Sequence, residues 1–272
     1  MRKLRRLTEA EVIADFLRGE FFHKEYDADR DRFTAIVEHP DLTNATENEI
    51  RRILLFRRRD TMWWELPEDR QWWEIEFNPD DVELVSVFPR AHWRKIARGN
   101  FSALHVAERV RQLKDSGSDE FLRKISAIGS RLATDLRQED LRQEDLRQEG
   151  LPQEDLPQDD LPQGMIILLG LDEQRPVTLL EGNHRFIAAL LAGGPELLKN
   201  GRMVAVFSPQ MEKCCWYKTN FLTLARCLKN RIKHYWDRDT DLARLLAAGT
   251  TRGSFEGYGG AGAVKSKYVK SK

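Results

Sequence analysis

The sequence predicts an α+β fold, in which a small mixed sheet carries flanking helices. Short apolar or alternating runs that are typical of strands are interspersed with amphipathic stretches that have helical periodicity. One strand-like run, at 177–181, passes through a single glycine directly into an apolar helix at 183–193. A proline-bearing repeat at about 136–164 interrupts the pattern, which indicates an insertion in an otherwise compact domain.

The composition gives no sign of several broad classes of protein. The 272 residues carry 44 Lys plus Arg and 44 Asp plus Glu, so net charge gives no argument for a nucleic-acid or membrane partner. No run approaches the roughly 18 apolar residues that span a bilayer. The three cysteines, Cys214, Cys215 and Cys227, are odd in number and two are adjacent, which argues against a disulfide framework and favours a cytoplasmic setting. They lack Cys-x-x-Cys spacing, so no metal site is predicted.

An N-terminal helical region is expected over residues 1–70. Thr8 and Glu11 have the spacing of a capping box, and apolar residues then recur at helical intervals through residue 19. A second helix is expected over Glu47–Arg59, which includes the arginine-rich stretch RRILLFRRR. Arginines that cover apolar surface and pair with acids are the favoured interpretation of this stretch, and contact with nucleic acid is the alternative.

The core domain is expected over residues 71–210 and begins with a segment rich in tryptophan. QWWEIEF alternates as a strand does, DDVELVSVF predicts a short second element, and Phe101–Leu113 has helical periodicity. A core filled by large aromatic side chains is the favoured role for these tryptophans, and a platform on which bases stack is the alternative.

The repeat places leucine at every fifth position from Leu136 to Leu161. Five residues advance a helix by about 140° net of a full turn, so these leucines do not share one face. Pro152 is the first of three prolines that forbid a continuous helix through the second half. Residues 136–164 hold three arginines and nine acids, a net charge of −6, so we expect a solvated and disordered insertion.

Regular structure is expected to resume after the repeat. Residues 165–170 and 177–180 predict two buried strands joined as a hairpin, and 203–208 predicts another strand. Residues 211–248 are expected to form a C-terminal helical region, with a long amphipathic helix at Thr219–Trp236. The Gly-rich, basic residues 249–272 are expected to be a disordered tail.

The chemistry of the chain concentrates at the strand-to-helix junction, Glu181–Arg185. The first turn of a helix has free N–H groups and a partial positive charge, which together favour a phosphate. Gly182 would let an anion approach the backbone, Asn183 is a suitable N-cap, and Arg185 can bind a phosphate with two hydrogen bonds. His184 could donate to an oxyanion or move a proton, and Glu181 could act as a base. In the structural alternative, Asn183 caps the helix, Arg185 pairs with a nearby acid and His184 is a hydrogen-bonded interior group.

The stretch LLEGNHRFIAALLAG resembles the signature of the ParB/sulfiredoxin-like superfamily, the ParB-like nuclease domain fold. That signature is a strand, a Gly-x-x-Arg turn and a helix with Ala three residues later, matched here by Gly182, Arg185 and Ala188. The form is most similar to the Asp-Gly-His-(His/Thr)-Arg turn of the superfamily's free-serine kinases. Asn183 stands where sulfiredoxins have their cysteine, so sulfinic acid reduction is not expected. The layout of 82–113 is similar to the first block of the superfamily, which implies Arg90 and Arg94 as further phosphate contacts.

The resemblance implies a nucleotide-binding protein whose cofactor is ATP or another nucleotide with Mg²⁺. The expected activity is phosphoryl transfer to an unknown small-molecule acceptor or nucleotide hydrolysis, with Glu181 and His184 as catalytic residues. Phosphates would lie on Gly182, Asn183, His184 and Arg185. The alternative is a non-catalytic module that binds a nucleotide or nucleic acid, although nucleic acid is not the favoured partner and no membrane is expected.

Overall fold

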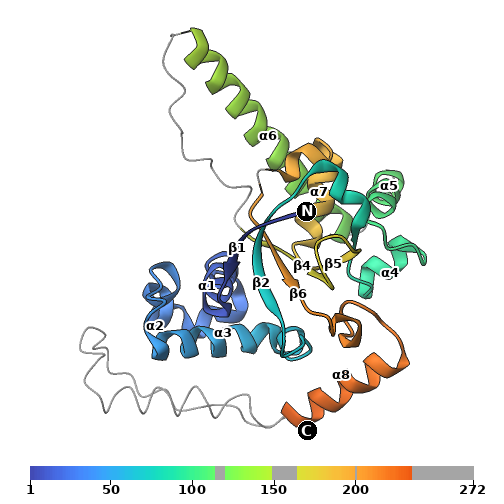
Figure 1. Ribbon diagram of the computed structural model, residues 1–272. Helices are drawn as coiled ribbons and strands as arrows, with labels where there is room; N and C mark the ends of the chain where they lie inside the picture. Colours follow the sequence, from blue (N-terminus) through green and yellow to red (C-terminus); the bar gives the residue numbers. More distant parts are fainter. Residues whose placement is uncertain (114–119, 149–163, 200, 235–272) are drawn as a thin grey trace.

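The computed structural model describes residues 1–113, 120–148, 164–199 and 201–234. Within them six strands form one sheet, and helices cover both of its faces (Figure 1). The strands are β1 (Arg2–Leu7), β2 (Gln71–Glu76), β3 (Val85–Ser86), β4 (Ile166–Gly170), β5 (Val177–Glu181) and β6 (Met203–Phe207). The α-helices are α1 (Glu9–Glu20), α2 (Asp27–Glu38), α3 (Ala45–Trp63), α4 (Ala91–Ala97), α5 (Ala103–Leu113), α6 (Glu120–Gln148), α7 (Asn183–Ala192) and α8 (Phe221–His234). Short 3-10 turns are η1 (Lys24–Tyr26), η2 (Pro79–Leu84), η4 (Pro195–Leu198) and η5 (Met211–Lys213).

The sheet is open and mixed, with the strand order β1-β2-β6-β4-β5-β3. β4 and β5 pair antiparallel, so the predicted hairpin is confirmed. β6 lies parallel to β4 and antiparallel to β2, and the short β3 lies parallel to β5. The mixed α+β class expected from the sequence is therefore confirmed.

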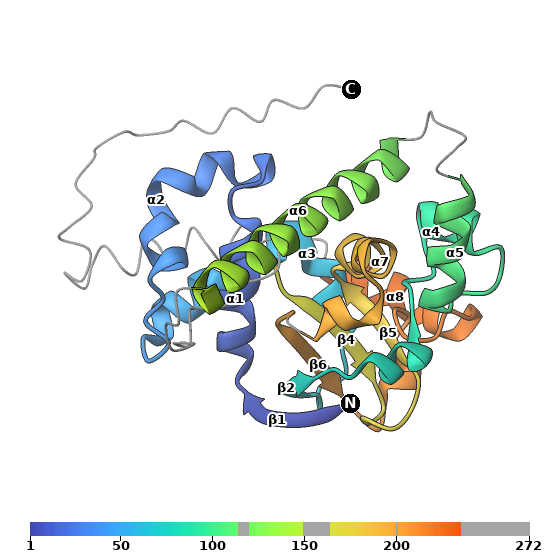
Figure 2. The same cartoon turned by 90° about the horizontal axis from the view of Figure 1, so that it is seen from above.

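Successive side chains of a strand point to opposite faces of the sheet, and in the central strands a hydrophobic cluster buries the side chains on each face. In β4, Ile167 and Leu169 belong to one hydrophobic cluster, whereas Ile166 and Leu168 belong to another. The first cluster joins the sheet to α1, α2 and α3, and the second joins it to α4, α5, α6 and α7. Figures 1 and 2 show these two groups of helices on opposite sides of the sheet.

The N-terminal residues contribute to the sheet as well as to the helices. The capping box predicted at the start of α1 is confirmed, since Glu11 N donates to Thr8 Oγ1 and Thr8 N donates to Glu11 Oε2. The strand β1, which precedes α1, was not expected from the sequence. It pairs antiparallel with β2 at one edge of the sheet. Four of the six residues of β1 are arginine or lysine and only two are apolar, so the strand lacks the alternation that identifies a half-buried strand.

The repeat departs from the sequence-based expectation in its first half. Helix α6 continues to Gln148, so residues 136–148 are helical and the predicted disorder is wrong for them. Leu, Arg, Gln and Glu all have high helix propensity, and proline first occurs at Pro152, beyond the helix end. Residues 149–163 of the insertion and the tail 249–272 lie outside the described residues.

Large aromatic side chains fill the core, as the favoured interpretation of the tryptophans predicts. Trp63 and Trp72 are buried and stack with ring centroids 5.2 Å apart, and Trp93 is buried in the second cluster. In α3, Arg51 is fully buried and donates to the backbone oxygens of Ile36 and Asp41. This arginine is therefore a structural group rather than one that could contact a nucleic acid.

Candidate functional site

The junction between β5 and α7 is held tightly against β4. Gly182 has φ of 82°, in the left-handed region, and it occupies the N-cap position of α7. A Cβ at Gly182 would lie 2.9 Å from Ile166 Cγ1 and 3.2 Å from Ile166 Cα. Glycine is therefore required here both by its backbone conformation and by the approach of a neighbouring strand.

Asn183 ties the junction to the segment that follows β3. Its side chain is buried; Oδ1 accepts a hydrogen bond from Phe88 N at 3.0 Å, and Nδ2 donates to Leu179 O at 3.4 Å. It is the first residue of α7, and no side chain caps this helix. The prediction that Asn183 is the N-cap is therefore wrong, and its polar atoms are used within the fold.

The carboxylate of Glu181 lies over the start of the turn. Gly182 N donates to Glu181 Oε1 at 3.1 Å, so the first amide that could face a phosphate already has an anionic acceptor. The turn thus has the donor pattern expected of an anion site, but an acid of the chain itself occupies part of it.

His184 sits among aromatic rings. Its ring centroid lies 4.7 Å from that of Phe121 and 5.3 Å from that of Trp93. Burial lowers the pKa of His184 to about 4, helped by the positive charges of Lys124 and Arg185 and opposed by Glu181. His92 also lowers it slightly. The imidazole is therefore neutral at physiological pH, so it can donate one hydrogen bond and accept another but carries no positive charge for a phosphate.

Arg185 reaches across the start of β4. Its Nη2 donates to Met165 O at 2.8 Å, and its guanidinium packs against Gly164, where an added Cβ would lie 2.6 Å from Arg185 Cζ. Its Nε is buried without a hydrogen-bond partner. Because that atom is buried, a ligand could contact this half-buried side chain only through its terminal Nη groups.

Arg185 lines a cavity of about 330 Å³. The cavity opens between α1, the end of α2, α6 and α7, at the end of the sheet where β4 and β6 begin. Its polar lining consists of three arginines and two acids, and its apolar lining includes Phe22, Leu132 and Ile166. The five charged residues are Asp15, Arg18, Glu38, Arg185 and Arg202.

Asp15 organises the charges of this cavity. Its carboxylate accepts from Arg202 Nη2 at 2.7 Å and pairs with Arg18 Nη1 at 3.5 Å. Burial raises the pKa of Asp15, although both arginines oppose that shift. The lining carries three guanidinium groups and two carboxylates, Asp15 among them, so it is positive by one charge when all five groups are ionised.

The other two predicted phosphate contacts have different partners. Arg90 lies over the ring of Trp216, 3.3 Å from the centroid, and its Nη2 donates to Cys215 Sγ at 3.4 Å. Arg94 is exposed and its Nε donates to Pro89 O at 2.9 Å. Neither residue lines the cavity, so among the predicted contacts it is Arg185 that the structure places there.

Sequence reasoning missed the remaining charged residues of the cavity. Asp15 and Arg18 lie on the polar side of α1, and Arg202 precedes β6. These three positions have no motif in common, since they are brought together by the packing of α1 across the sheet rather than by spacing along the chain.

In the part of the chain that the structure describes, no helix combines the length and apolar character needed to cross a bilayer. Comparison with models of protein families found no match, and comparisons with curated proteins and with solved structures found none either. The likeness to the ParB/sulfiredoxin-like superfamily therefore stays an expectation from the sequence.

Proposed function

We propose that this protein binds a nucleotide, or another compact molecule bearing a phosphate, in the cavity beside Arg185. The single observation that carries the proposal is the arginine set: Arg18, Arg185 and Arg202 line one cavity. Guanidinium groups are well suited to bind phosphate oxygens in pairs.

The cavity also suits the rest of such a ligand. Its volume of about 330 Å³ is at the lower end of the range for small-molecule sites. Phe22, Leu132 and Ile166 give it an apolar wall beside the arginines, which would accommodate a base or a similar flat group. The ligand is therefore expected to combine an anionic end with an apolar end.

This placement modifies the expectation drawn from the junction. The phosphate would be bound by the arginine at the end of the Gly-x-x-Arg turn, and not by the amide of Gly182, which donates to Glu181. Glu181 and His184, the residues expected to be catalytic, are not among the lining residues. The geometry thus favours the binding-module alternative over a Mg²⁺-dependent phosphotransferase or hydrolase.

A thermal-shift screen with ATP, ADP, CTP, GTP and inorganic pyrophosphate, each with and without Mg²⁺, tests the proposal. A ligand at a hundredfold excess over its Kd should stabilise the fold by about 2.7 kcal/mol, a rise in Tm of roughly 5–10 °C. Arg185→Ala should weaken the affinity by roughly 10-fold to 100-fold, because it removes charge-assisted hydrogen bonds. Arg175→Ala is the matched control, since Arg175 is exposed on a loop and pairs with Asp172.

Asp15→Asn gives the sharpest discrimination. If an anion binds here, this change frees Arg18 and Arg202 from their ion pairs and should tighten binding of the anion. If the carboxylate of Asp15 instead contacts the ligand directly, the same change should weaken binding. Absence of any shift with all the ligands, or equal losses in Arg185→Ala and Arg175→Ala, would refute the proposal. Phosphate release from ATP that Glu181→Gln abolishes while binding persists would restore the enzyme hypothesis.

A further inference from the structure

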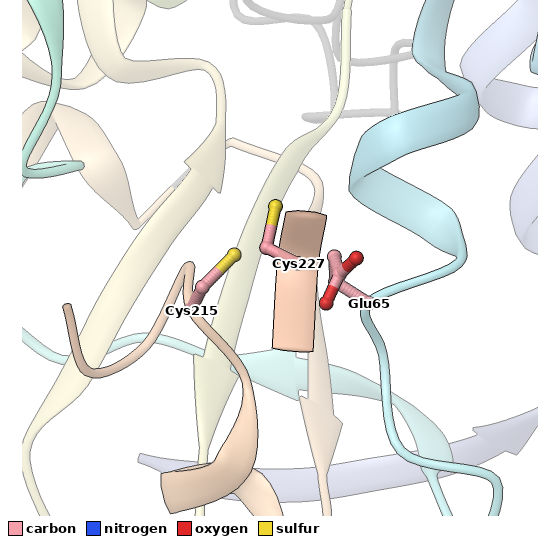
Figure 3. Close-up of side chains that lie close together, drawn as sticks. All are labelled: Glu65, Cys215 and Cys227. Atoms are coloured by element: carbon pink, nitrogen blue, oxygen red, sulfur yellow. The ribbon is translucent and has the colours of Figure 1, made fainter. Parts of the chain in front are cut away.

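Three side chains with metal-binding atoms meet where the end of α3, the loop after η5 and α8 come together. Glu65 follows α3, Cys215 lies in the loop after η5, and Cys227 is on α8. Their carboxylate oxygen and two sulfur atoms all lie within 4.8 Å of one another, and all three residues are buried. Figure 3 shows the three side chains beside each other, each supplied by a different segment.

The donor set matches the preference of a thiophilic divalent cation. Two thiolates and one carboxylate are ligands that Zn²⁺ accepts, and tetrahedral coordination at about 2.3 Å separates two sulfur atoms by about 3.8 Å. The observed spacing is compatible with this geometry after a small rotation of the side chains. With three protein ligands, the fourth position of such a site belongs to a solvent molecule.

A second set of contacts supports the three donors. Arg90 Nη2 donates to Cys215 Sγ at 3.4 Å, and Asn230 Nδ2 donates to Glu65 Oε1 at 3.2 Å. Such outer contacts orient metal ligands and tune their basicity. The charges also balance, because two thiolates and a carboxylate carry three negative charges, which a divalent cation and the guanidinium of Arg90 neutralise.

Coordination of a divalent cation would deprotonate the two thiols and the carboxyl group and release their protons to solvent. The three donor atoms are already gathered within 4.8 Å of one another in a buried position, which is the arrangement that such a site requires.

We propose that Glu65, Cys215 and Cys227 form a binding site for one Zn²⁺-like cation, with Arg90 and Asn230 as positioning residues. The site would join α8 to the body of the protein, because its ligands come from the end of α3, the loop after η5 and α8 itself. The spacing along the chain, with eleven residues between the cysteines and the acid far upstream, explains why no metal motif is evident in the sequence.

Titration of the reduced, full-length chain with Co²⁺ under anaerobic conditions tests the site without any nucleotide. Co²⁺ bound by thiolates gives a sulfur-to-metal charge-transfer band and intense visible bands, which report both stoichiometry and ligand type. We expect one Co²⁺ per chain, displaced by one equivalent of Zn²⁺, with a Kd for Zn²⁺ below about 1 μM.

Cys214 provides a matched control, because it is adjacent to Cys215 and buried but is not part of the three-residue cluster. Cys214→Ser should leave the spectrum unchanged. Cys227→Ser should weaken binding by more than about 100-fold, and Asn230→Ala by roughly 10-fold to 100-fold. Glu65→Gln should keep the charge-transfer band but weaken binding.

Three results would overturn the proposal. The first is the absence of a charge-transfer band in the reduced wild-type chain, and the second is an equal loss of binding in Cys214→Ser and Cys227→Ser. The third is a Cys215–Cys227 disulfide in the freshly purified protein, detected by mass spectrometry of peptides under non-reducing conditions. Far-ultraviolet circular dichroism of each variant separates loss of the site from loss of the fold.

Discussion

Substitution of Gly182 by alanine tests whether this glycine is needed for packing of the junction. Two costs are expected. Alanine in the left-handed region costs about 1–2 kcal/mol, of which the lower entropy of the unfolded chain offsets about 0.4–1 kcal/mol. In addition, the new methyl group would lie 2.9 Å from Ile166 Cγ1 and 3.2 Å from the Cα of the same residue. Because the second contact is with backbone, rotation of a side chain cannot relieve it, and overpacking of this kind costs about 1–3 kcal/mol.

Gly99 separates the two costs. It also has a positive φ, of 97°, but a Cβ there would meet nothing within 4 Å. Gly99→Ala should therefore lower the free energy of unfolding by about 1 kcal/mol or less, and Gly182→Ala should lower it by about 1–3 kcal/mol more. Urea unfolding followed by circular dichroism, with equal m values, gives the comparison. If the two variants lose the same stability within about 0.5 kcal/mol, the close approach of β4 is not the reason for glycine at this position.

Two further predictions concern buried polar groups. The pKa of His184, about 4, lies below the ordinary value of 6.5, so the free energy of unfolding should be constant above about pH 6.5 and should fall as the pH drops from there toward 4. His184→Gln should remove that slope in urea unfolding measured between pH 4 and 7.5, and an unchanged slope would contradict the assignment. Arg51→Leu should cost about 2–4 kcal/mol, because the carbonyl oxygens of Ile36 and Asp41 lose their charged donor. Arg52→Leu, at a more exposed position paired with Glu49, should cost less than about 1 kcal/mol, and equal losses would argue against a buried arginine network.

Local patterns along the chain were sufficient to predict much of the fold. Alternation identified β2, continuous apolar runs identified β4, β5 and β6, and helical spacing together with a capping box identified α1. The misses have physical causes. β1 is strongly charged, and its place in the sheet depends on a partner about 70 residues away in sequence, which no local pattern encodes. The helical part of the repeat follows from residue propensity, which outweighs the absence of an apolar face.

The candidate sites divide in the same way. Arg185 could be identified because a short motif holds it at a strand-to-helix turn. Its partners Arg18 and Arg202 could not, since a helix that precedes the core domain and a loop before β6 bring them to it. The cluster of Glu65, Cys215 and Cys227 could not be identified from the sequence at all, because tertiary packing alone brings its three residues together.

The position of the arginine cavity has a consequence for how occupancy would be transmitted through the molecule. The sheet separates the two helical layers along most of its length, but the cavity lies where β4 and β6 begin, and its lining includes α1 from one layer and α7 from the other. A ligand there would contact both helical layers at the same end of the sheet and would stabilise them relative to each other. Slower amide exchange would then be expected in both helices at once, although they belong to separate hydrophobic clusters.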